Sequence, residues 1–536
     1  MEAKFQIFLI LLAVLAVAAL IARRVNVAPA ILLLISGIVL AFIPGMPSFQ
    51  LPPELVLLLV LPPLIYSAAV AMSWREFRFN LRPIGLLAIG CVIFTACAVA
   101  AACHYLLGLP WNIGFLLGAI VAPPDAVAPL AIARRIGLPR RILVILEGEG
   151  LANDATALIL YRFAVAAVMT GAFSLPKAAG TFAAIMAGEL AFGIAIGWLS
   201  LRARQLVRDP QIEITLSLLT PYLAYWIPEH LGGSGVIATV ACGLYISWNG
   251  PLLISAATRL QGIFFWDLVI YLIEGMLFLL TGFQMRVLYE KSKAFPFAEI
   301  LTATLVVAAV MIAARFLWVY PATYLPRLIS KRIRKREPRP SWRATFVVGF
   351  TGVRGAVSLA TALALPYALP GGSDFPDRDL IQFVAFGVIL ITLVGLGLTL
   401  PAVVSLLGVN CDALTEHRTE REREIAARRE ALGAAMQSFD EISKDRDLSD
   451  GLVGVLKSRH EIRASLLPDP LDDDARQQTE ESISLVRELI AAERRFIHAQ
   501  LRQGAITDEA RRRIERDLDL EEASLANHQT GGAGPL

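Results

Sequence analysis

The sequence predicts an all-α membrane protein with about thirteen transmembrane helices and a helical cytosolic tail. Hydrophobic residues make up 56% of its 536 residues and charged residues only 18%, a balance typical of chains that lie in lipid. About half of the charged residues follow Cys411. We therefore expect two domains, a transmembrane domain at residues 1–410 and a cytosolic tail at residues 411–536.

Apolar runs long enough to cross a bilayer recur along most of the chain. A span needs roughly 20 apolar residues at about 1.5 Å of rise each. The first run lacks the basic start and cleavage site of a signal peptide, so we interpret it as a retained helix. The predicted spans are residues 6–21, 27–44, 53–72, 83–107, 111–133, 142–170, 176–201, 212–228, 234–248, 261–285, 297–325, 342–366 and 380–407.

Basic residues are concentrated in alternate loops between these spans. The positive-inside rule places such loops in the cytoplasm, which puts the N-terminus outside and, with an odd number of spans, the tail inside. The sequence carries no transit peptide, so we expect a multi-pass protein of a plasma membrane, specifically a bacterial inner membrane. The basic loops are at residues 23–24, 75–82, 134–141, 202–208, 259 and 327–343, and the loop at 286–293 is the exception.

Several classes of function lack support in the sequence. The net charge of +3 does not indicate a nucleic-acid partner, and the five scattered cysteines suggest neither disulfides nor a metal site. An embedded enzyme needs a nucleophile with a base or a metal motif such as HExxH, which is absent. A channel should show a glycine-rich filter, and gated potassium efflux a GxGxxG in the tail; neither is present.

The tail is rich in Arg, Glu, Ala and Leu with charges of mixed sign. Residues 415–437 and 475–525 have helical composition, and Pro468 and Pro470 mark a break between them. Runs of mixed charge usually form solvated helices. A dimerising or regulatory module is the alternative.

A few ionisable residues lie inside the apolar domain, where each costs at least ~2.5 kcal/mol on insertion scales and needs an explanation. Glu189 and Glu274 are candidate partners of Arg162. We interpret these three residues and Arg315 as contacts that hold helices together. The full set is Asp125, Glu147, Glu149, Asp154, Arg162, Glu189, Glu274, Arg315 and Arg354.

Two of the predicted spans contain a break. Pro123 and Pro124 precede Asp125 in an apolar run, and adjacent prolines interrupt a helix. Irregular backbone at membrane depth is tolerated where it lines a polar cavity, and broken helices mark ion sites of transporters. An inverted repeat requires a second broken span, for which Gly349–Ser358, with three glycines around Arg354, is the candidate. The alternatives are a simple loop at Asp125 and a border segment with a snorkelling Arg354.

Asn153 and Asp154 form the most informative pair. Apolar residues follow Asp154 up to Val168, so Asp154 lies well inside its span. Desolvation there disfavours a bare carboxylate, which should hold either a proton or a small cation. One site with two mutually exclusive ligands is the physical basis of antiport, and Asn153 adds an uncharged dipole. The alternative is a structural carboxylate paired with Arg354.

Four segments, which follow one another along the chain in the family's order, resemble the monovalent cation:proton antiporter family 1, which includes NhaP-type antiporters and sodium/proton exchangers. The resemblance covers about residues 5–407. Gly118–Ala128 and Gly352–Ala360 look like the two crossing helices of the family. Glu149–Asp154 looks like its Glu-Ser-Leu-x-Asn-Asp signature, and Phe278–Gln284 like its Phe-Leu-x-x-Gly-Leu-Gln segment.

This resemblance implies a thirteen-helix homodimer with a dimerisation domain and a mobile core, which exchanges Na⁺ (or Li⁺ or K⁺) for H⁺ without a cofactor, in pH and sodium homeostasis. Asp154 would bind the transported Na⁺ or the proton in turn, and Asp125 would offset exposed helix N-termini. Glu149 would pair with Arg354 and would also belong to the ion-binding site, together with Asn153, Asp125 and the main chain of Pro124. The Asn153–Asp154 pair is similar to that of the electroneutral, one-for-one branch.

Two departures from the family pattern bear on cation selectivity. Pro124 stands where the family has Thr, so the cation contact would fall to main-chain carbonyls there. Gly150 stands where the family has Ser, which removes a second hydroxyl oxygen.

Overall fold

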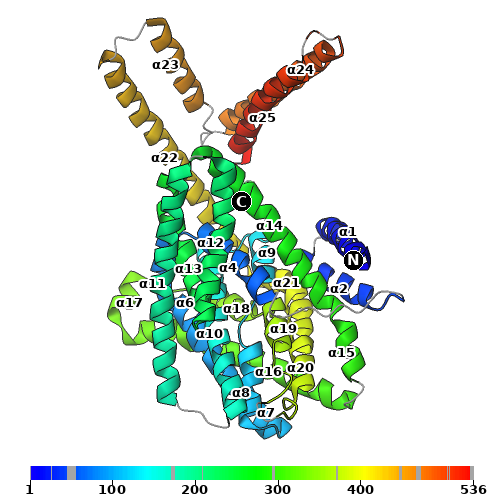
Figure 1. Cartoon of the computed structure of the whole chain (residues 1–536). Helices are drawn as coiled ribbons and strands as arrows, with labels where there is room; N and C mark the ends of the chain where they lie inside the picture. The colour runs from blue at the N-terminus through cyan, green and yellow to red at the C-terminus, as the bar shows by residue number, and fades with distance from the viewer. Residues whose placement is uncertain are drawn as a thin grey trace. The chain divides into compact units, whose positions relative to one another are not determined.

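Helices account for almost all of the described residues, and no strand occurs among them (Figure 1). The computed structural model describes residues 2–25, 27–44, 56–170, 175–207, 209–292, 296–337, 339–369, 372–445, 450–465, 473–503, 505 and 507–530. The chain divides into two compact units, Met1–Ala413 and Leu414–Leu536. The prediction of an all-α protein is confirmed.

The first unit consists of long and short α-helices and three π-helical segments, each of which adjoins an α-helix. In chain order these are α1 (Glu2–Val25), α2 (Pro29–Ala41), η1 (Val56–Val60), α4 (Leu61–Ala71), α5 (Trp74–Phe79), α6 (Leu81–Gly85), η2 (Leu86–Cys91), α7 (Val92–Leu107), α8 (Trp111–Val121), α9 (Val127–Arg135), α10 (Arg140–Thr170), α11 (Leu175–Val207), α12 (Pro210–His230), α13 (Val236–Leu253), α14 (Ala256–Phe283), α15 (Met285–Ser292), α16 (Phe297–Ile329), α17 (Lys331–Arg336), α18 (Trp342–Phe350), α19 (Ala356–Leu363), α20 (Arg378–Leu390), η3 (Ile391–Leu396) and α21 (Gly397–Leu407).

Local sequence explains where several helices start and stop. Asp209 caps α12 by accepting hydrogen bonds from the backbone N–H groups of Gln211 and Ile212, at 2.9 and 3.1 Å. Glycines end two other helices, since α7 stops at Gly108 and α21 stops at Gly408. Their φ angles of 70° and 65° lie in the left-handed region that glycine tolerates.

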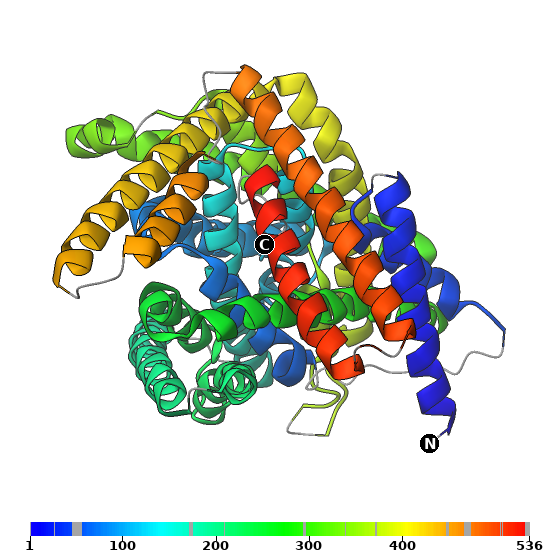
Figure 2. The ribbon, with the colours of Figure 1, turned by 90° about the horizontal axis from the view of Figure 1, so that it is seen from above.

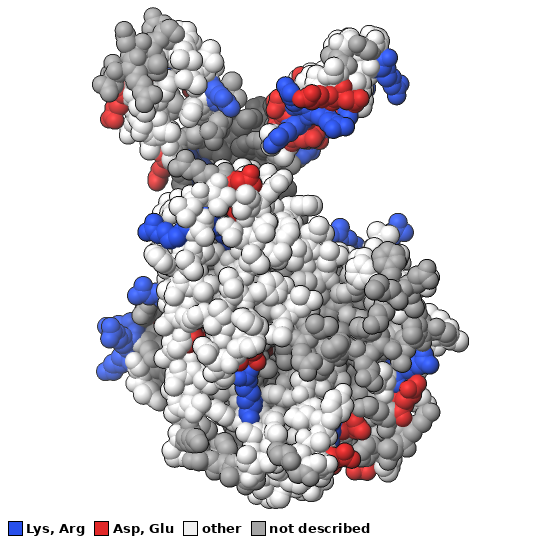
Figure 3. All heavy atoms as spheres, viewed as in Figure 1, with Lys and Arg blue, Asp and Glu red and all other residues white. Residues whose placement is uncertain are grey.

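Eight of the described helices are long and apolar enough to cross a membrane, and three shorter ones are also apolar. The first unit in Figure 3 accordingly presents a face made mainly of uncharged residues. Within the described residues, each predicted span coincides with one helix or with consecutive helices; residues 53–55 of the span 53–72 lie outside them. The number of crossings stays a prediction. The long candidates are Gln6–Val25, Leu81–Leu107, Arg140–Thr170, Gly180–Val207, Val236–Leu253, Ala256–Glu290, Phe297–Ile329 and Arg378–Leu407, and the shorter are Pro29–Ala41, Leu58–Ala71 and Trp111–Val121.

Both predicted breaks are present. The backbone leaves the helical conformation between α8 and α9 at residues 122–126, and between α18 and α19 at residues 351–355. At 1.5 Å per residue none of these four helices reaches across a hydrocarbon core of about 30 Å alone. Each pair is therefore one interrupted crossing rather than two spans joined by a loop.

Small residues set the closest helix contacts. Helix α2 packs against α14 through Gly37 and Gly282, and a Cβ atom on either would overlap backbone atoms of the other helix. Gly193 brings α11 equally close to the backbone of α13 at Ala238. Figure 2, viewed from above, shows α11, α12 and α13 end-on as a tight group.

The second unit, from Leu414 on, contains the larger part of α22 (Val409–Asp445) and all of α23 (Asp450–Ser465), α24 (Asp473–Arg502) and α25 (Asp508–Thr530). Helices α24 and α25 pack against each other around Ile490 and Leu518. Arg494 on α24 pairs with Asp519 and Glu522 on α25, at 2.6 and 2.7 Å. These five residues join α24 and α25 in a helical hairpin within the tail.

We expect Gly37→Ala to lower stability by about 1–3 kcal/mol, because the new methyl group must push the α14 backbone away. The measurement is the midpoint of thermal unfolding in detergent. Gly188→Ala on α11 is the control, since a Cβ there meets no atom within 4 Å. Equal midpoints for the two variants would contradict the close α2–α14 contact.

Candidate functional site

The two interruptions lie against each other at the centre of the site. The backbone N–H of Asp125 donates to the carbonyl of Val353 at 2.8 Å, which joins the α8–α9 break to the α18–α19 break. Four helix ends therefore meet there. Two of them, at α8 and α18, present unsatisfied carbonyls, and two, at α9 and α19, present unsatisfied N–H groups.

Arg354 satisfies the carbonyl end of α8. Its side chain is 1% exposed and donates to the carbonyls of Val121 and Ala122, at 2.8 and 2.9 Å, and to that of Gly352. A cation at a helix C-terminus also offsets the negative end of the helix dipole. The snorkelling alternative for Arg354 is wrong, because its guanidinium is buried against the main chain.

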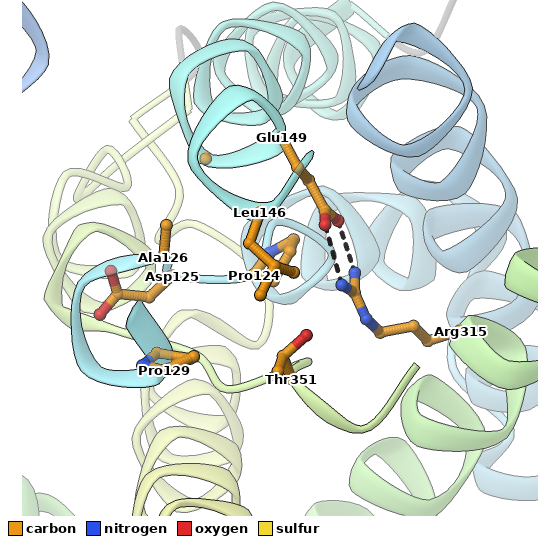
Figure 4. A pocket seen from close by; sticks show the side chains of 9 residues that line it. Pro124, Asp125, Ala126, Pro129, Leu146, Glu149, Arg315 and Thr351 are labelled. Atoms are coloured by element: carbon orange, nitrogen blue, oxygen red, sulfur yellow. Dashed lines mark hydrogen bonds and ion pairs between the residues drawn. The ribbon is translucent and has the colours of Figure 1, made fainter. Parts of the chain in front are cut away.

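Arg315 has the equivalent role at the end of α18. It projects from α16 and donates to the carbonyl of Val348, at 3.3 Å from Nε and 3.0 Å from Nη2. The same guanidinium binds Glu149 of α10 in a two-pronged ion pair, at 2.6 and 2.9 Å (Figure 4). Both side chains are 2% exposed. Planar, bidentate geometry of this kind is the strong form of an ion pair.

The expected pairing of Glu149 with Arg354 is therefore corrected: the partner of Glu149 is Arg315. The physical reason is that the N–H groups of Arg354 are already directed at the α8 carbonyls and Gly352. The sequence contained one signal for Arg315, which lies in the middle of a long apolar run.

Asp125 lies at the N-terminal ends of α9 and α19, where backbone N–H groups are left without helical partners. Its Oδ1 accepts a hydrogen bond from the backbone N–H of Val127 at 3.0 Å, in the first turn of α9. Its carboxylate also packs directly against Gly355, the residue before α19, where any Cβ would overlap it. Negative charge at two helix N-termini is electrostatically favourable.

Asn153 and Asp154 approach the same crossing from α10. The Nδ2 of Asn153 donates to the carbonyl of Pro124 at 2.6 Å. Its Oδ1 is buried and has no hydrogen-bond partner among the described residues. Asp154 is half-buried, close enough to Asp125 for the two carboxylates to interact electrostatically, and no ion pair to it occurs in the described part of the chain. The alternative in which Asp154 pairs with Arg354 thus receives no support.

A small pocket separates Asp125 from the Glu149–Arg315 pair, as Figure 4 shows. Gly150 is part of its wall, and a Cβ there would overlap the side chain of Ala126. This contact explains why serine is not accommodated at residue 150 without a further change. Sequence reasoning did not single out Pro129 or Leu146, and it interpreted Arg315 as a contact between helices. The lining residues are Pro124, Asp125, Ala126, Pro129, Leu146, Glu149, Gly150, Arg315 and Thr351.

The other buried charges hold a separate group of elements together. Arg162 of α10 binds Glu229 of α12 and the carbonyl of Gly233, so neither Glu189 nor Glu274 is its partner in the described structure. Glu189 instead accepts hydrogen bonds from the backbone of Ser234 and Gly235 and from the Ser234 hydroxyl. The interpretation of these residues as contacts between helices is consistent with this geometry.

This arrangement defines a class of protein. Apolar helices surround two interrupted helices whose ends are matched by buried charges, next to a carboxylate without a fixed partner. The described residues include no group of three or more His, Cys, Asp or Glu side chains able to hold a metal ion. The molecule is a multi-pass membrane transporter.

Comparison with known proteins identifies the family. The profile described as "Sodium/hydrogen exchanger, transmembrane" matches residues 10–406, so the chain belongs to the sodium/hydrogen exchanger family. An uncharacterized Na⁺/H⁺ exchanger of Mycobacterium tuberculosis is 35% identical over 525 residues, covering 96% of this chain and 95% of the relative. A sodium, potassium, lithium and rubidium/H⁺ antiporter of Bacillus subtilis is 32% identical over 459 residues, covering 83% and 68%.

The fold is also found in a solved structure. The sodium proton antiporter MjNhaP1 from Methanocaldococcus jannaschii superposes with a TM-score of 0.59 at 18% sequence identity, over 76% of this chain and 98% of that one. The similarity noted from the four sequence segments is thereby confirmed at the level of family and fold.

We expect Glu149→Gln or Arg315→Gln to reduce stability by about 3–5 kcal/mol, because each leaves one buried charge without its partner. Thermal unfolding in detergent measures the loss. The double variant should lose less than the sum of the single losses.

The matched control is the Arg134–Glu147 pair, which is similar in length at 2.8 Å but mostly exposed on the Arg134 side. Arg134→Gln should cost less than about 1 kcal/mol. Strictly additive losses at Glu149 and Arg315 would contradict the direct pairing.

Proposed function

We propose that the protein is a secondary active transporter that exchanges Na⁺ for H⁺ across the membrane by alternating access, with Li⁺ and K⁺ as further candidate cations. The observation that carries the proposal is the position of Asp154: a half-buried carboxylate at the crossing of two interrupted helices, with no ion pair among the described residues. Its negative charge calls for either a proton or a cation. The two ligands exclude each other, and this competition couples the two fluxes.

In the proposed site Asp154 is the group that changes its ligand, and its neighbours supply neutral oxygens. The buried Oδ1 of Asn153 has no protein donor in the described structure and can accept from water or face a cation. The Pro124 carbonyl already accepts from Asn153 Nδ2, and a carbonyl oxygen has a second lone pair for a cation. Asp125 adds negative charge beside Asp154.

Glu149 has a structural role in this proposal. Its two oxygens are taken by Arg315, so it sets the charge of the pocket wall and the position of α10 rather than binding the ion directly. The Asn153–Asp154 pair contains a single carboxylate that can bind a proton. One such carboxylate favours the exchange of one cation for one proton, and a cycle of this kind moves no net charge.

The cellular setting is proposed from the sequence. The distribution of basic loops favours an outside N-terminus, a cytoplasmic tail and residence in a bacterial plasma membrane. Homodimer formation and a role in pH and sodium homeostasis follow from the family resemblance. The relative from Bacillus subtilis is named for four alkali cations. This breadth, with Pro124 in place of a hydroxyl residue, favours selectivity wider than Na⁺ alone.

The proposal is tested by proton movement in proteoliposomes with an imposed pH gradient. Addition of Na⁺, Li⁺ or K⁺ should release or take up protons with the wild-type protein, followed by a pH-sensitive dye. Asp154→Asn should reduce this flux to the level of protein-free vesicles, because the amide binds neither a proton nor a cation strongly. Asp267→Asn makes the same change at an exposed position of α14 and should leave the flux intact. Full flux in Asp154→Asn would exclude the proposed site.

The one-for-one ratio has a separate test in the same vesicles. With the membrane potential clamped or varied by a potassium ionophore, the rate of Na⁺-driven proton movement should stay constant. A rate that follows the potential would show net charge transfer and overturn electroneutrality while leaving antiport in place. Cation flux driven by voltage without proton movement would favour a channel instead.

A further inference from the structure

A buried group of charges at one end of the bundle is not used by the transport site. Arg82, Arg141 and Arg327 all bind one carboxylate, that of Glu337, at 2.6, 3.4 and 3.0 Å. We call these four residues the Glu337 cluster. They come from α6, α10, α16 and the segment after α17. Three guanidinium groups therefore share one carboxylate, so positive charge exceeds negative charge.

The donors of this cluster are incompletely satisfied. Nε and Nη1 of Arg82, and Nε of Arg327, are buried and have no hydrogen-bond partner among the described residues. The Arg327 side chain is 9% exposed and that of Arg82 is 23% exposed, so the cluster is mostly sheltered while part of the Arg82 side chain reaches the surface. Buried N–H groups of a charged side chain call for an acceptor, and planar guanidinium groups match phosphate oxygens in particular.

The location of the cluster favours a lipid-borne phosphate. Arg82 and Arg141 lie at the starts, and Arg327 at the end, of three helices that are candidate membrane spans. Their shared end of the bundle is thus where lipid headgroups lie. Exposed apolar side chains, Leu328 and Ile329, adjoin the cluster along the chain.

Helix α17 adds long-range attraction. It directly follows α16 and carries exposed basic side chains, visible at its position in Figure 3. Juxtamembrane basic residues attract anionic lipid near the surface, and basic pockets between membrane helices bind anionic headgroups. These side chains are Lys331, Arg332, Arg334 and Lys335.

We propose that the Glu337 cluster binds the phosphate group of an anionic phospholipid, with Arg82 and Arg327 as its direct donors and α17 as the surface that concentrates such lipids. Glu337 holds the three arginines at one point, which prevents mutual repulsion from dispersing them when no lipid is bound. A bound headgroup would then fasten α6, α10 and α16 to one another. The site is independent of the cation site proposed at Asp154.

The test uses full-length protein purified in neutral detergent and stripped of lipid. Native mass spectrometry counts retained lipid, and thermal unfolding gives the stabilisation on titration. Phosphatidylglycerol should bind and raise the midpoint, whereas phosphatidylcholine should not. Arg82→Gln and Arg327→Gln should each weaken binding of phosphatidylglycerol by about tenfold, through loss of charge-assisted hydrogen bonds. Neutralising the four exposed basic residues of α17 should weaken binding without altering the buried cluster.

The matched control is Arg23→Gln with Arg24→Gln, which removes two exposed charges at the end of α1. It should bind phosphatidylglycerol as the wild type does. Inorganic phosphate separates the two sources of ligand. Protection by phosphate alone, lost in Arg82→Gln, would retain the phosphate site but assign it to a soluble anion. Equal phosphatidylglycerol binding by wild type, Arg82→Gln and Arg327→Gln would overturn the proposal, as would an equal loss in the α1 control.

Discussion

Breaking two helices inside a membrane leaves backbone groups without partners in a medium where each costs several kcal/mol, and the rest of the site depends on how this cost is met. The carbonyl ends of α8 and α18 receive one arginine each, Arg354 and Arg315. The N–H ends of α9 and α19 share Asp125. Glu149 balances the second arginine. The interrupted backbone and its fixed charges therefore depend on one another.

The fixed donors of the neighbouring carboxylates also distinguish them from Asp154, which has none in the described part of the chain. Three other carboxylates of the bundle have fixed donors: Glu149 has a guanidinium, Asp125 a helix N-terminus, and Glu189 the backbone and hydroxyl of a glycine-rich turn. Asp154 reaches the same region with no ion pair in the described residues. A charge without a fixed partner is the one whose ligand can change in each cycle, whereas the others would lose their structural role if they released theirs.

The sequence predicted those parts of the fold and site that depend on local chemistry. Adjacent prolines at 123–124 and three glycines around Arg354 locate both breaks, since each disrupts helical hydrogen bonding within its own segment. The sequence did not predict the ion pairs between helices, because these depend on which faces of distant helices lie against each other. Glu149 and Arg315 are 166 positions apart, and sequence alone offered Arg354 as an equally good cation. The Arg162–Glu229 pair is unpredicted for the same reason, and Glu229 also falls just past the predicted span 212–228.

The Arg162–Glu229 and Glu149–Arg315 ion pairs differ in burial. Under the proposed mechanism, this difference indicates which helix contacts open at the lower cost in free energy. Alternating access requires contacts that break in each cycle and contacts that persist. The Arg162–Glu229 pair joins α10 to α12 with side chains 34% and 26% exposed, and partly solvated pairs of this kind contribute little net stability. The Glu149–Arg315 pair is 2% exposed, and separating it would strand two charges. We therefore expect α10, α16 and the two interrupted helices to move as one block, with the contacts of Arg162 to α12 and to the turn before α13 opening at its edge.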